Sequence, residues 1–261
     1  MVGLHTLHAR HAYPPRMTAD PTGFTRRDVG RLALLATWAV GASSAVNNLL
    51  DFPPAPFRSL AKEVYLEAQS AAALGASTRK LRVLEIGAGL GLSSVFEDRF
   101  VAGSEVLAMD VASPDPARYR AAQARAVDRG YDLKFIQGDA TELSSLADSS
   151  VDCVCCSLTL CSVASCEAAV SEVRRVLRPG GTFGYVEHVS VIDEDDRPLL
   201  ALSQKLLDPL QQRVAHGCHL TRDSPSVIRD RFGSDKVLSA QRSVEASMWP
   251  VSQLAAGVVA R

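Results

Sequence analysis

The sequence lacks several features that mark specialised classes of protein. Its 261 residues sum to a formal net charge of −1, so no overall basic field draws the chain to nucleic acid. It shows no internal repeat and no low-complexity tract. With 47% hydrophobic and 22% charged residues, the composition is that of an ordinary globular chain. These values exclude a disordered tail protein, a collagen and a coiled coil.

The sequence also lacks the cysteine pattern of a disulfide framework. Five of its six cysteines fall between Cys153 and Cys166, and the sixth is Cys218. Cys153 and Cys156 form a C-x-x-C pair, but they lie in an apolar run that is typical of a strand. Residues three apart on a strand point to opposite faces, so these two cannot share a metal or a bridge. We therefore predict core thiols in a reducing compartment and no bound metal.

A basic leader precedes a mildly acidic body. Residues 1–50 contain five Arg and two Asp, whereas residues 51–261 contain 23 basic and 27 acidic residues. Arg26-Arg27, an apolar stretch over 32–46 and a run of small residues are together typical of a twin-arginine export or thylakoid-transfer signal. The apolar stretch has 15 residues, whereas a bilayer span needs roughly 20. An uncleaved interfacial anchor and a packed helix therefore stay open as alternatives.

A proline-rich linker over 51–56 separates this leader, 1–50, from a single domain, 51–261. Strand and helix patterns alternate along the domain, which predicts a doubly wound, mainly parallel α/β sheet of seven strands. The predicted strands cover 81–86, 105–110, 133–137, 151–158, 182–188, 237–244 and 254–260. The predicted helices cover 57–74, 92–101, 116–129, 142–147, 165–177 and 224–231. A turn is expected over 178–181, and an apolar helical insertion follows the fifth strand, with its helix over 199–210.

The first predicted strand runs into the glycine-rich turn Glu85-Ile86-Gly87-Ala88-Gly89-Leu90-Gly91. Glycines let the backbone turn tightly and approach a ligand closely. A nicotinamide or flavin fingerprint would read G-x-G-x-x-G/A, but position 92 is Leu and the third glycine comes one residue early. The pattern E-x-G-x-G-x-G instead resembles that of class I S-adenosylmethionine-dependent methyltransferases.

Residues at the ends of the next strands strengthen this resemblance. Asp110 ends the second strand, where a carboxylate accepts both ribose hydroxyls, and Asp139 follows the third, where similar enzymes place an Asp near the adenine amino group. Arg178-Pro179-Gly180-Gly181 is a turn that is common in these enzymes before the fifth strand. The resemblance implies a Rossmann-like methyltransferase fold with S-adenosylmethionine as cofactor at the carboxyl edge of the sheet. The implied cofactor-binding residues are Glu85, Gly87, Ala88, Gly89, Gly91, Asp110, Val111, Asp139, Ala140, Ser157 and Leu158.

A narrower resemblance rests on motifs that follow the fourth strand. Leu-Cys-Ser-Val over 160–163, Glu187-His188-Val189, Leu-Asp-Pro over 207–209 and Gly-Cys-His-Leu-Thr-Arg over 217–222 occur in this order. Over about residues 81–222 the chain resembles the methyltransferase-like 7 family, membrane-associated enzymes that methylate small thiols. The chain departs from the family at His219, where Asn is usual, and in its twin-arginine leader.

The resemblance implies methyl transfer to a small, lipophilic acceptor, with a thiol as the first expectation. A thiol acceptor has to lose its proton, and His188 is the first candidate for the general base because an unperturbed His titrates near neutrality. The other reading of His188 is a structural residue. Asp208 and His216 are weaker candidates, and Cys161 and Cys218 are expected to line the substrate pocket or to pack. The helical insertion is read either as a packed cap or as a lid over the site.

Four other functions compete with thiol methylation. C- or O-methylation of a quinone or phenol ring belongs to the same class of enzyme. A noncatalytic interaction module with the cofactor fold is disfavoured by the intact Gly87, Gly89 and Gly91 with Asp110. A nicotinamide oxidoreductase is disfavoured by Leu92. A nucleic-acid methyltransferase is disfavoured by the acidic body and by the lack of an N-P-P-Y-type motif after the fourth strand.

The leader and the body point to different compartments. Export would end where S-adenosylmethionine has little obvious supply, whereas the body carries six apparently unpaired thiols. We therefore expect the protein to work on the supplied, reducing side of a membrane. Residues 32–46 would hold it there, with Arg26, Arg27 and Arg31 at the anionic surface. A plastid-directing role for residues 1–24 is compatible with this expectation, and export by the twin-arginine route is the alternative.

Overall fold

The computed structural model describes residues 53–76, 79–89, 98–192 and 197–261. The leader, with its predicted signal or anchor, lies outside the described residues, as do Gly91 and most of the helix predicted over 92–101. All the described residues belong to one compact unit. Within them, no helix has both the length and the apolar character that crossing a membrane requires.

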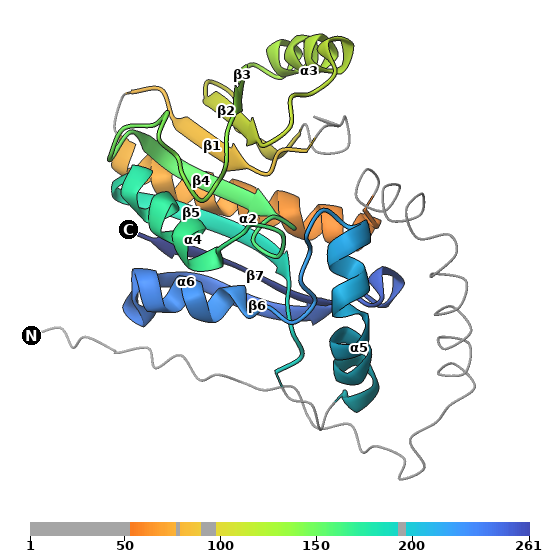
Figure 1. Cartoon of the computed structure of the whole chain (residues 1–261). Helices are drawn as coiled ribbons and strands as arrows, with labels where there is room; N and C mark the ends of the chain where they lie inside the picture. The colour runs from red at the N-terminus through yellow and green to blue at the C-terminus, as the bar shows by residue number, and fades with distance from the viewer. Residues whose placement is uncertain (1–52, 77–78, 90–97, 193–196) are drawn as a thin grey trace, which may run out of the picture. The chain divides into compact units, whose positions relative to one another are not determined.

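A seven-stranded sheet forms the centre of the described structure, in the order β3-β2-β1-β4-β5-β7-β6 (Figure 1). Five strands are parallel, and β7 pairs antiparallel with both β5 and β6. The strands are β1 Arg82–Ile86, β2 Glu105–Asp110, β3 Asp132–Gln137, β4 Val151–Ser157, β5 Leu177–His188, β6 Val237–Val244 and β7 Gln253–Ala260. The predicted doubly wound, mainly parallel α/β sheet is therefore confirmed.

Helices cover both faces of this sheet (Figure 1). α2 (Ala55–Ala76) packs along β4, β5 and β7 on one face, while α4 (Cys166–Val176) and α6 (Ser224–Phe232) lie together on the other. α3 (Pro116–Asp128) packs beside β3. The main apolar core fills the space between the strands and α4 with α6. The central strands are buried on both faces, as parallel strands between two helical layers have to be.

Gly184 lets α2 approach the centre of β5 closely. A Cβ atom at this position would lie 2.9 Å from the Ala68 methyl carbon and 3.3 Å from the Val64 carbonyl oxygen. Thr182, two residues earlier on the same face of β5, donates its hydroxyl to the Ala68 carbonyl oxygen at 2.7 Å. This close contact fixes α2 against the strand whose carboxyl end carries Glu187 and His188.

The six cysteines are all buried and unpaired, which confirms the prediction of core thiols without a disulfide framework. Cys153 and Cys155 lie on the same face of β4, with their sulfur atoms 3.6 Å apart. The Cys156 thiol is directed at the Glu187 carboxylate instead, at 3.3 Å.

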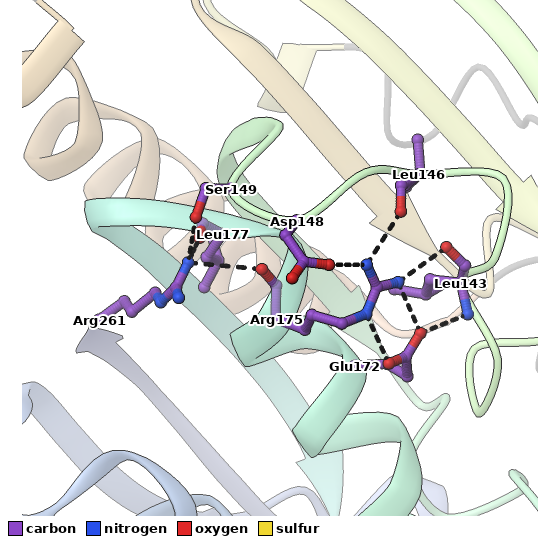
Figure 2. A network of polar contacts seen from close by, with 8 residues as sticks. All are labelled: Leu143, Leu146, Asp148, Ser149, Glu172, Arg175, Leu177 and Arg261. Carbon is purple, nitrogen blue, oxygen red and sulfur yellow. Dashed lines mark hydrogen bonds and ion pairs between the residues drawn. The ribbon is translucent and has the colours of Figure 1, made fainter.

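The helix predicted over 142–147 is wrong, because this segment forms a series of turns. Its carbonyl groups bond to a side chain from α4 instead of to helical N–H groups. The Arg175 guanidinium donates to the carbonyl oxygens of Leu143 at 2.9 Å and Leu146 at 3.0 Å, and it pairs with Glu172 and Asp148 (Figure 2). The apolar residues of this segment therefore pack against α4 without forming a helix of their own.

The predicted turn over 178–181 is also different in the structure, because β5 begins earlier, at Leu177. Leu177 pairs with Val151 and Thr182 pairs with Cys153, so the residues between them bulge out of the strand. Gly180, at φ +76°, supplies the left-handed conformation that this bulge requires. The backbone of Arg261 then bonds to Gly180 and Gly181, which ties the bulge to the chain beyond β7.

The helical insertion after β5 is confirmed as α5 (Pro198–Val214), which is longer than the predicted helix. Its inner face includes Gln204, whose side-chain amide bonds to the backbone of Val189 and Val191. Leu202 and Leu206 lie on its outer face and are 52% and 69% exposed. The inner contacts show a packed cap helix, and its role as a lid stays a prediction.

The network around Arg175 gives a test of stability. We expect Arg175→Met to lower the free energy of unfolding by about 2–3 kcal/mol, because two carbonyl oxygens and Glu172 lose a charged donor. The matched control is Lys62→Met, which removes a pair with Asp98 between half-exposed side chains and should cost at most about 1 kcal/mol. Denaturant unfolding of both variants measures the difference. Equal losses would contradict the role given to Arg175.

Candidate functional site

The glycine-rich turn after β1 has the backbone geometry that the sequence predicts. Gly87 and Gly89 have φ values of +68° and +73°, a region that side chains other than glycine rarely adopt. A Cβ atom on Gly87 would overlap the Thr159 side chain, whereas one on Gly89 would have no neighbour within 4 Å among the residues that the structure describes. The turn therefore packs closely on the segment after β4 at Gly87.

Asp110 lies at the carboxyl end of β2, beside this turn. Its carboxylate accepts hydrogen bonds from the backbone N–H of Gly89 at 2.9 Å and of Ala112 at 3.2 Å. A carboxylate has about four lone-pair positions, so these two bonds leave capacity for further donors. Asp110 thus holds the glycine turn and, being only half-buried, still offers acceptor positions to a ligand.

Glu85, unlike Asp110, is buried and does not face solvent. Its buried carboxylate forms an ion pair with Arg99 and accepts a hydrogen bond from the Tyr65 hydroxyl at 3.3 Å. Burial raises the pKa of Glu85, and the charge of Arg99 opposes that rise. The Arg99 guanidinium also stacks over the Tyr65 ring, 5.1 Å from its centre. Sequence analysis missed Tyr65 and Arg99, because neither belongs to a recognisable motif.

The other predicted cofactor residues follow the ends of β2, β3 and β4. Val111 is exposed, and Ala140 is buried. Asp139 is exposed, and its carboxylate accepts bonds from the backbone and hydroxyl of Thr141, both at 2.8 Å. Ser157 and Leu158 are half-buried. Leu158 has φ +52°, a strained conformation for a leucine, and such strain often accompanies a functional site.

Glu187 fixes the segment that leaves β4. Its fully buried carboxylate accepts hydrogen bonds from the backbone N–H of Thr159 at 2.9 Å, Leu160 at 3.1 Å and Cys161 at 3.4 Å. Burial raises the pKa of Glu187, and the bonds from Thr159 and Leu160 act in the opposite direction. In the sequence, Glu187 stood out only as part of the Glu187-His188-Val189 motif. The signal for its role was the joint occurrence of the Leu-Cys-Ser-Val and Glu-His-Val motifs.

Cys161, His188 and Cys218 come together at the carboxyl ends of β4 and β5. The two sulfurs and an imidazole nitrogen all lie within 4.8 Å of one another, and all three side chains are buried. His188 Nε2 is 2.9 Å from the Cys218 sulfur. Hydrogen bonding from Cys161 and the charge of His188 lower the pKa of Cys218 to about 4, against the effect of burial. The hydrogen bond to Cys218, together with burial, raises the pKa of Cys161.

The segment that carries Cys218 is held by Asp208 and by the loop of Cys161. Asp208, on α5, accepts bonds from the backbone N–H of Leu220 at 2.6 Å and from the Gln212 side chain at 2.7 Å. The His219 backbone N–H donates to the Cys161 carbonyl oxygen at 2.9 Å. One oxygen of Asp208 therefore ties α5 to the segment that carries Cys218, and the other bonds within α5. His216, at φ +51°, lies in the same turn.

These residues fit the cofactor that the glycine motif implies. The remaining lone pairs of Asp110 suit the two ribose hydroxyls of that cofactor. Cys161, a member of the thiol and imidazole cluster, lies two residues beyond Thr159, which packs against Gly87 of the same turn. A cofactor and an acceptor could therefore meet at this edge of the sheet.

Comparison with known proteins agrees with this geometry. A family model described as a methyltransferase domain matches residues 84–184. The chain is 32% identical over 197 residues to human thiol S-methyltransferase TMT1B, covering 74% of this chain and 77% of the relative. It is 35% identical over 153 residues to the rat thiol S-methyltransferase TMT1B, covering 58% of this chain and 59% of the relative. The chain thus spans less than two thirds of the rat protein.

A solved structure shows the same fold at low sequence identity. The crystal structure of the [4+2]-cyclase SpnF matches with a TM-score of 0.52 and 15% identity, covering 77% of this chain and 79% of that one. At this identity the likeness concerns the fold alone.

Substitution of Asp110 tests whether the cofactor binds at the carboxyl edge of the sheet. We expect Asp110→Ala to weaken S-adenosylmethionine binding by about 1–3 kcal/mol, because hydrogen bonds to a charged acceptor are lost. The control is Asp132→Asn, since Asp132 begins β3 at the opposite edge of the sheet and pairs with Lys80. Calorimetry on folded variants measures both affinities. An unchanged affinity in Asp110→Ala would show that β2 does not deliver this carboxylate to the cofactor.

Proposed function

The chain belongs to the thiol S-methyltransferase family, the TMT1 proteins, and we propose on this basis that it transfers a methyl group to a small, lipophilic thiol. Members of this family are S-adenosylmethionine-dependent methyltransferases of class I. The fold, the glycine turn and Asp110 agree with that cofactor, which supplies the electrophilic methyl group when bound.

One observation carries the choice of a thiol as acceptor. The residues of the family-specific motifs, Cys161, His188 and Cys218, converge at the carboxyl edge of the sheet. Methyl transfer from a sulfonium is an in-line displacement, so the site contributes chiefly by positioning the acceptor sulfur. A thiol with a pKa near 8.5 needs only modest help to ionise, and a neighbouring imidazole is a group that can supply it.

The contacts of His188 and Asp208 refine their predicted roles. His188 Nε2 faces the Cys218 sulfur, so an acceptor thiol would compete with Cys218 for that nitrogen. The assignment of His188 as general base stays a prediction. Asp208 bonds through one oxygen to the Leu220 backbone, in the segment that carries Cys218, and we infer that it is a positioning residue.

The acceptor class can be tested with matched compounds. The purified full chain is incubated with methyl-labelled S-adenosylmethionine and with a thiol and a phenol of the same carbon skeleton. We expect at least about a tenfold higher kcat/KM for the thiol, because it ionises roughly 1.5 pH units below the phenol. The Asp110→Ala variant is the control for cofactor-dependent product.

Two results would contradict the proposal. Methylation of the phenol or of a quinone, with no methylated thiol, would favour the C- or O-methyltransferase alternative. Cofactor binding without any product from the panel would favour the noncatalytic module.

We further propose that the protein works at a membrane surface on the side that is supplied with S-adenosylmethionine. The leader supports this with its apolar stretch over 32–46 and its arginines. The described domain adds exposed apolar side chains at Leu199, Leu202 and Leu206, which share one face of α5. Lipophilic acceptors concentrate in bilayers, so this location suits the proposed substrates.

Fractionation with protease protection tests this location. C-terminally tagged full-length protein should sediment with membranes, keep residues 32–46 and be degraded by protease added to sealed membranes from the supplied side. A variant with Arg26, Arg27 and Arg31 replaced by Gln should be released at lower salt, because its attraction to anionic lipid is weaker. A mature N-terminus at Val46, protected inside a lumen, would overturn the anchor and support export.

A further inference from the structure

The Cys161, His188 and Cys218 cluster has the composition of a metal site. It combines two sulfur atoms and one imidazole nitrogen, all within 4.8 Å of one another. Cys161 is 1%, His188 1% and Cys218 6% exposed. The three residues come from three separate segments, after β4, at the end of β5 and after α5. Two cysteines and a histidine are a known ligand set of catalytic zinc.

Bonds that do not involve these three side chains hold the cluster together. The Glu187 carboxylate fixes the backbone at Cys161, and the His219 backbone N–H bonds to the Cys161 carbonyl oxygen. The Arg222 guanidinium donates to the carbonyl oxygens of Leu160 and Val163, at 2.7 and 2.6 Å. The fold therefore holds the backbone that carries Cys161 and Cys218 in place without an ion.

Two buried polar atoms at the cluster have no partner among the described residues. They are Nδ1 of His188 and the side-chain oxygen of Gln211, whose amide nitrogen lies 3.4 Å from the Cys218 sulfur. Buried polar atoms are nearly always paired, and exceptions often indicate an ion or a water. Because Nε2 is the ring nitrogen that faces Cys218, Nδ1 lies on the far side of the ring and would bond to an outer-shell group such as a water, not to an ion in the cluster.

We propose that Cys161, His188 and Cys218 bind one zinc ion. Soft thiolates with an imidazole favour Zn²⁺ over Mg²⁺ or Ca²⁺, which prefer oxygen ligands. Two thiolates and a neutral imidazole also balance the double charge of the ion, so the buried site carries no net charge. This proposal departs from the expectation of no bound metal, which considered only the C-x-x-C pair inside β4.

Zinc would change the contact between His188 and Cys218. Tetrahedral zinc with its usual bond lengths separates a nitrogen ligand from a sulfur ligand by about 3.6 Å, and two sulfur ligands by about 3.8 Å. Nε2 and the Cys218 sulfur, now 2.9 Å apart, would move apart by about 0.7 Å as two metal bonds replace their hydrogen bond.

The described residues supply three ligands, which leaves a fourth position for water or for an acceptor sulfur. This step rests on the proposed function. The acceptor thiol displaces the water, binds as a thiolate and releases its proton to solvent. Its sulfur then forms a bond to the methyl carbon while the carbon–sulfonium bond breaks, and the neutral thioether leaves as a weaker ligand. His188 would then act as a ligand and not as the general base.

The test measures metal directly on the full-length chain, purified under reducing conditions. We expect about one zinc per chain by elemental analysis. Exchange for Co²⁺ should give visible bands of tetrahedral geometry and a sulfur-to-cobalt charge-transfer band. Adding a small thiol should shift the visible bands if the fourth position is open. None of these measurements requires methyl transfer.

Variants assign the ligands. Cys161→Ser and Cys218→Ser should each lower zinc affinity at least about a hundredfold in competition with a chromophoric chelator, because even outer-shell changes cost 10–100-fold. Cys166→Ser is the matched control, since Cys166 is a buried cysteine at the start of α4 and not part of the cluster. It should bind zinc like the wild type. If a cluster variant does not fold, the metal content and the cobalt spectrum of the wild type still decide whether the chain has the zinc site.

The outcomes separate this proposal from the proposed function. Wild-type protein that stays metal-free in excess zinc, or binds it equally without Cys161 and Cys218, would overturn the zinc site. Methylation of thiols by such metal-free protein would leave the proposed function intact. A zinc-loaded protein that binds S-adenosylmethionine but methylates no thiol would overturn the function and keep the site. A Cys161–Cys218 disulfide in the reduced preparation would also overturn the zinc site. Mass spectrometry would show it as the loss of two hydrogen atoms.

Discussion

The buried carboxylate of Glu187 is the interaction on which the candidate site depends. It accepts hydrogen bonds from three successive backbone N–H groups, those of Thr159, Leu160 and Cys161, at the exit of β4. A charged group without solvent is costly unless it is paired, and these donors supply the pairing. The carboxylate thereby joins the end of β5 to the loop that carries Cys161.

The alternation of side chains along β5 also determines where His188 lies in the candidate acceptor site. Glu187 and His188 are neighbours on one strand, so they point to opposite faces. Glu187 holds the loop after β4, while His188 contacts Cys218 from the segment after α5. Asp208 holds that segment in turn, through the Leu220 backbone. Each motif of the family resemblance therefore either carries a member of the cluster or fixes the backbone beside one.

A second buried acid performs a comparable task at the cofactor edge. Glu85 is paired with Arg99 and Tyr65, so its charge connects β1 to α2 and to the segment before β2. Asp110 holds the glycine turn through the Gly89 backbone and still has acceptor capacity. The two acids therefore have different roles. The buried Glu85 stabilises this edge of the sheet, while the half-exposed Asp110 can contact a ligand.

The sequence by itself determined the order of strands and helices, the glycine turn and Asp110 at the end of β2, because these depend on local patterns and on the rule that ligands bind at strand ends. It failed at 142–147, where the carbonyls of Leu143 and Leu146 bond to Arg175 instead of forming a helix. Only the tertiary structure brought Cys161, His188 and Cys218 within 4.8 Å. Residues this far apart in sequence meet through the pairing of β4 with β5 and the return of α5, and no local pattern specifies those long-range contacts.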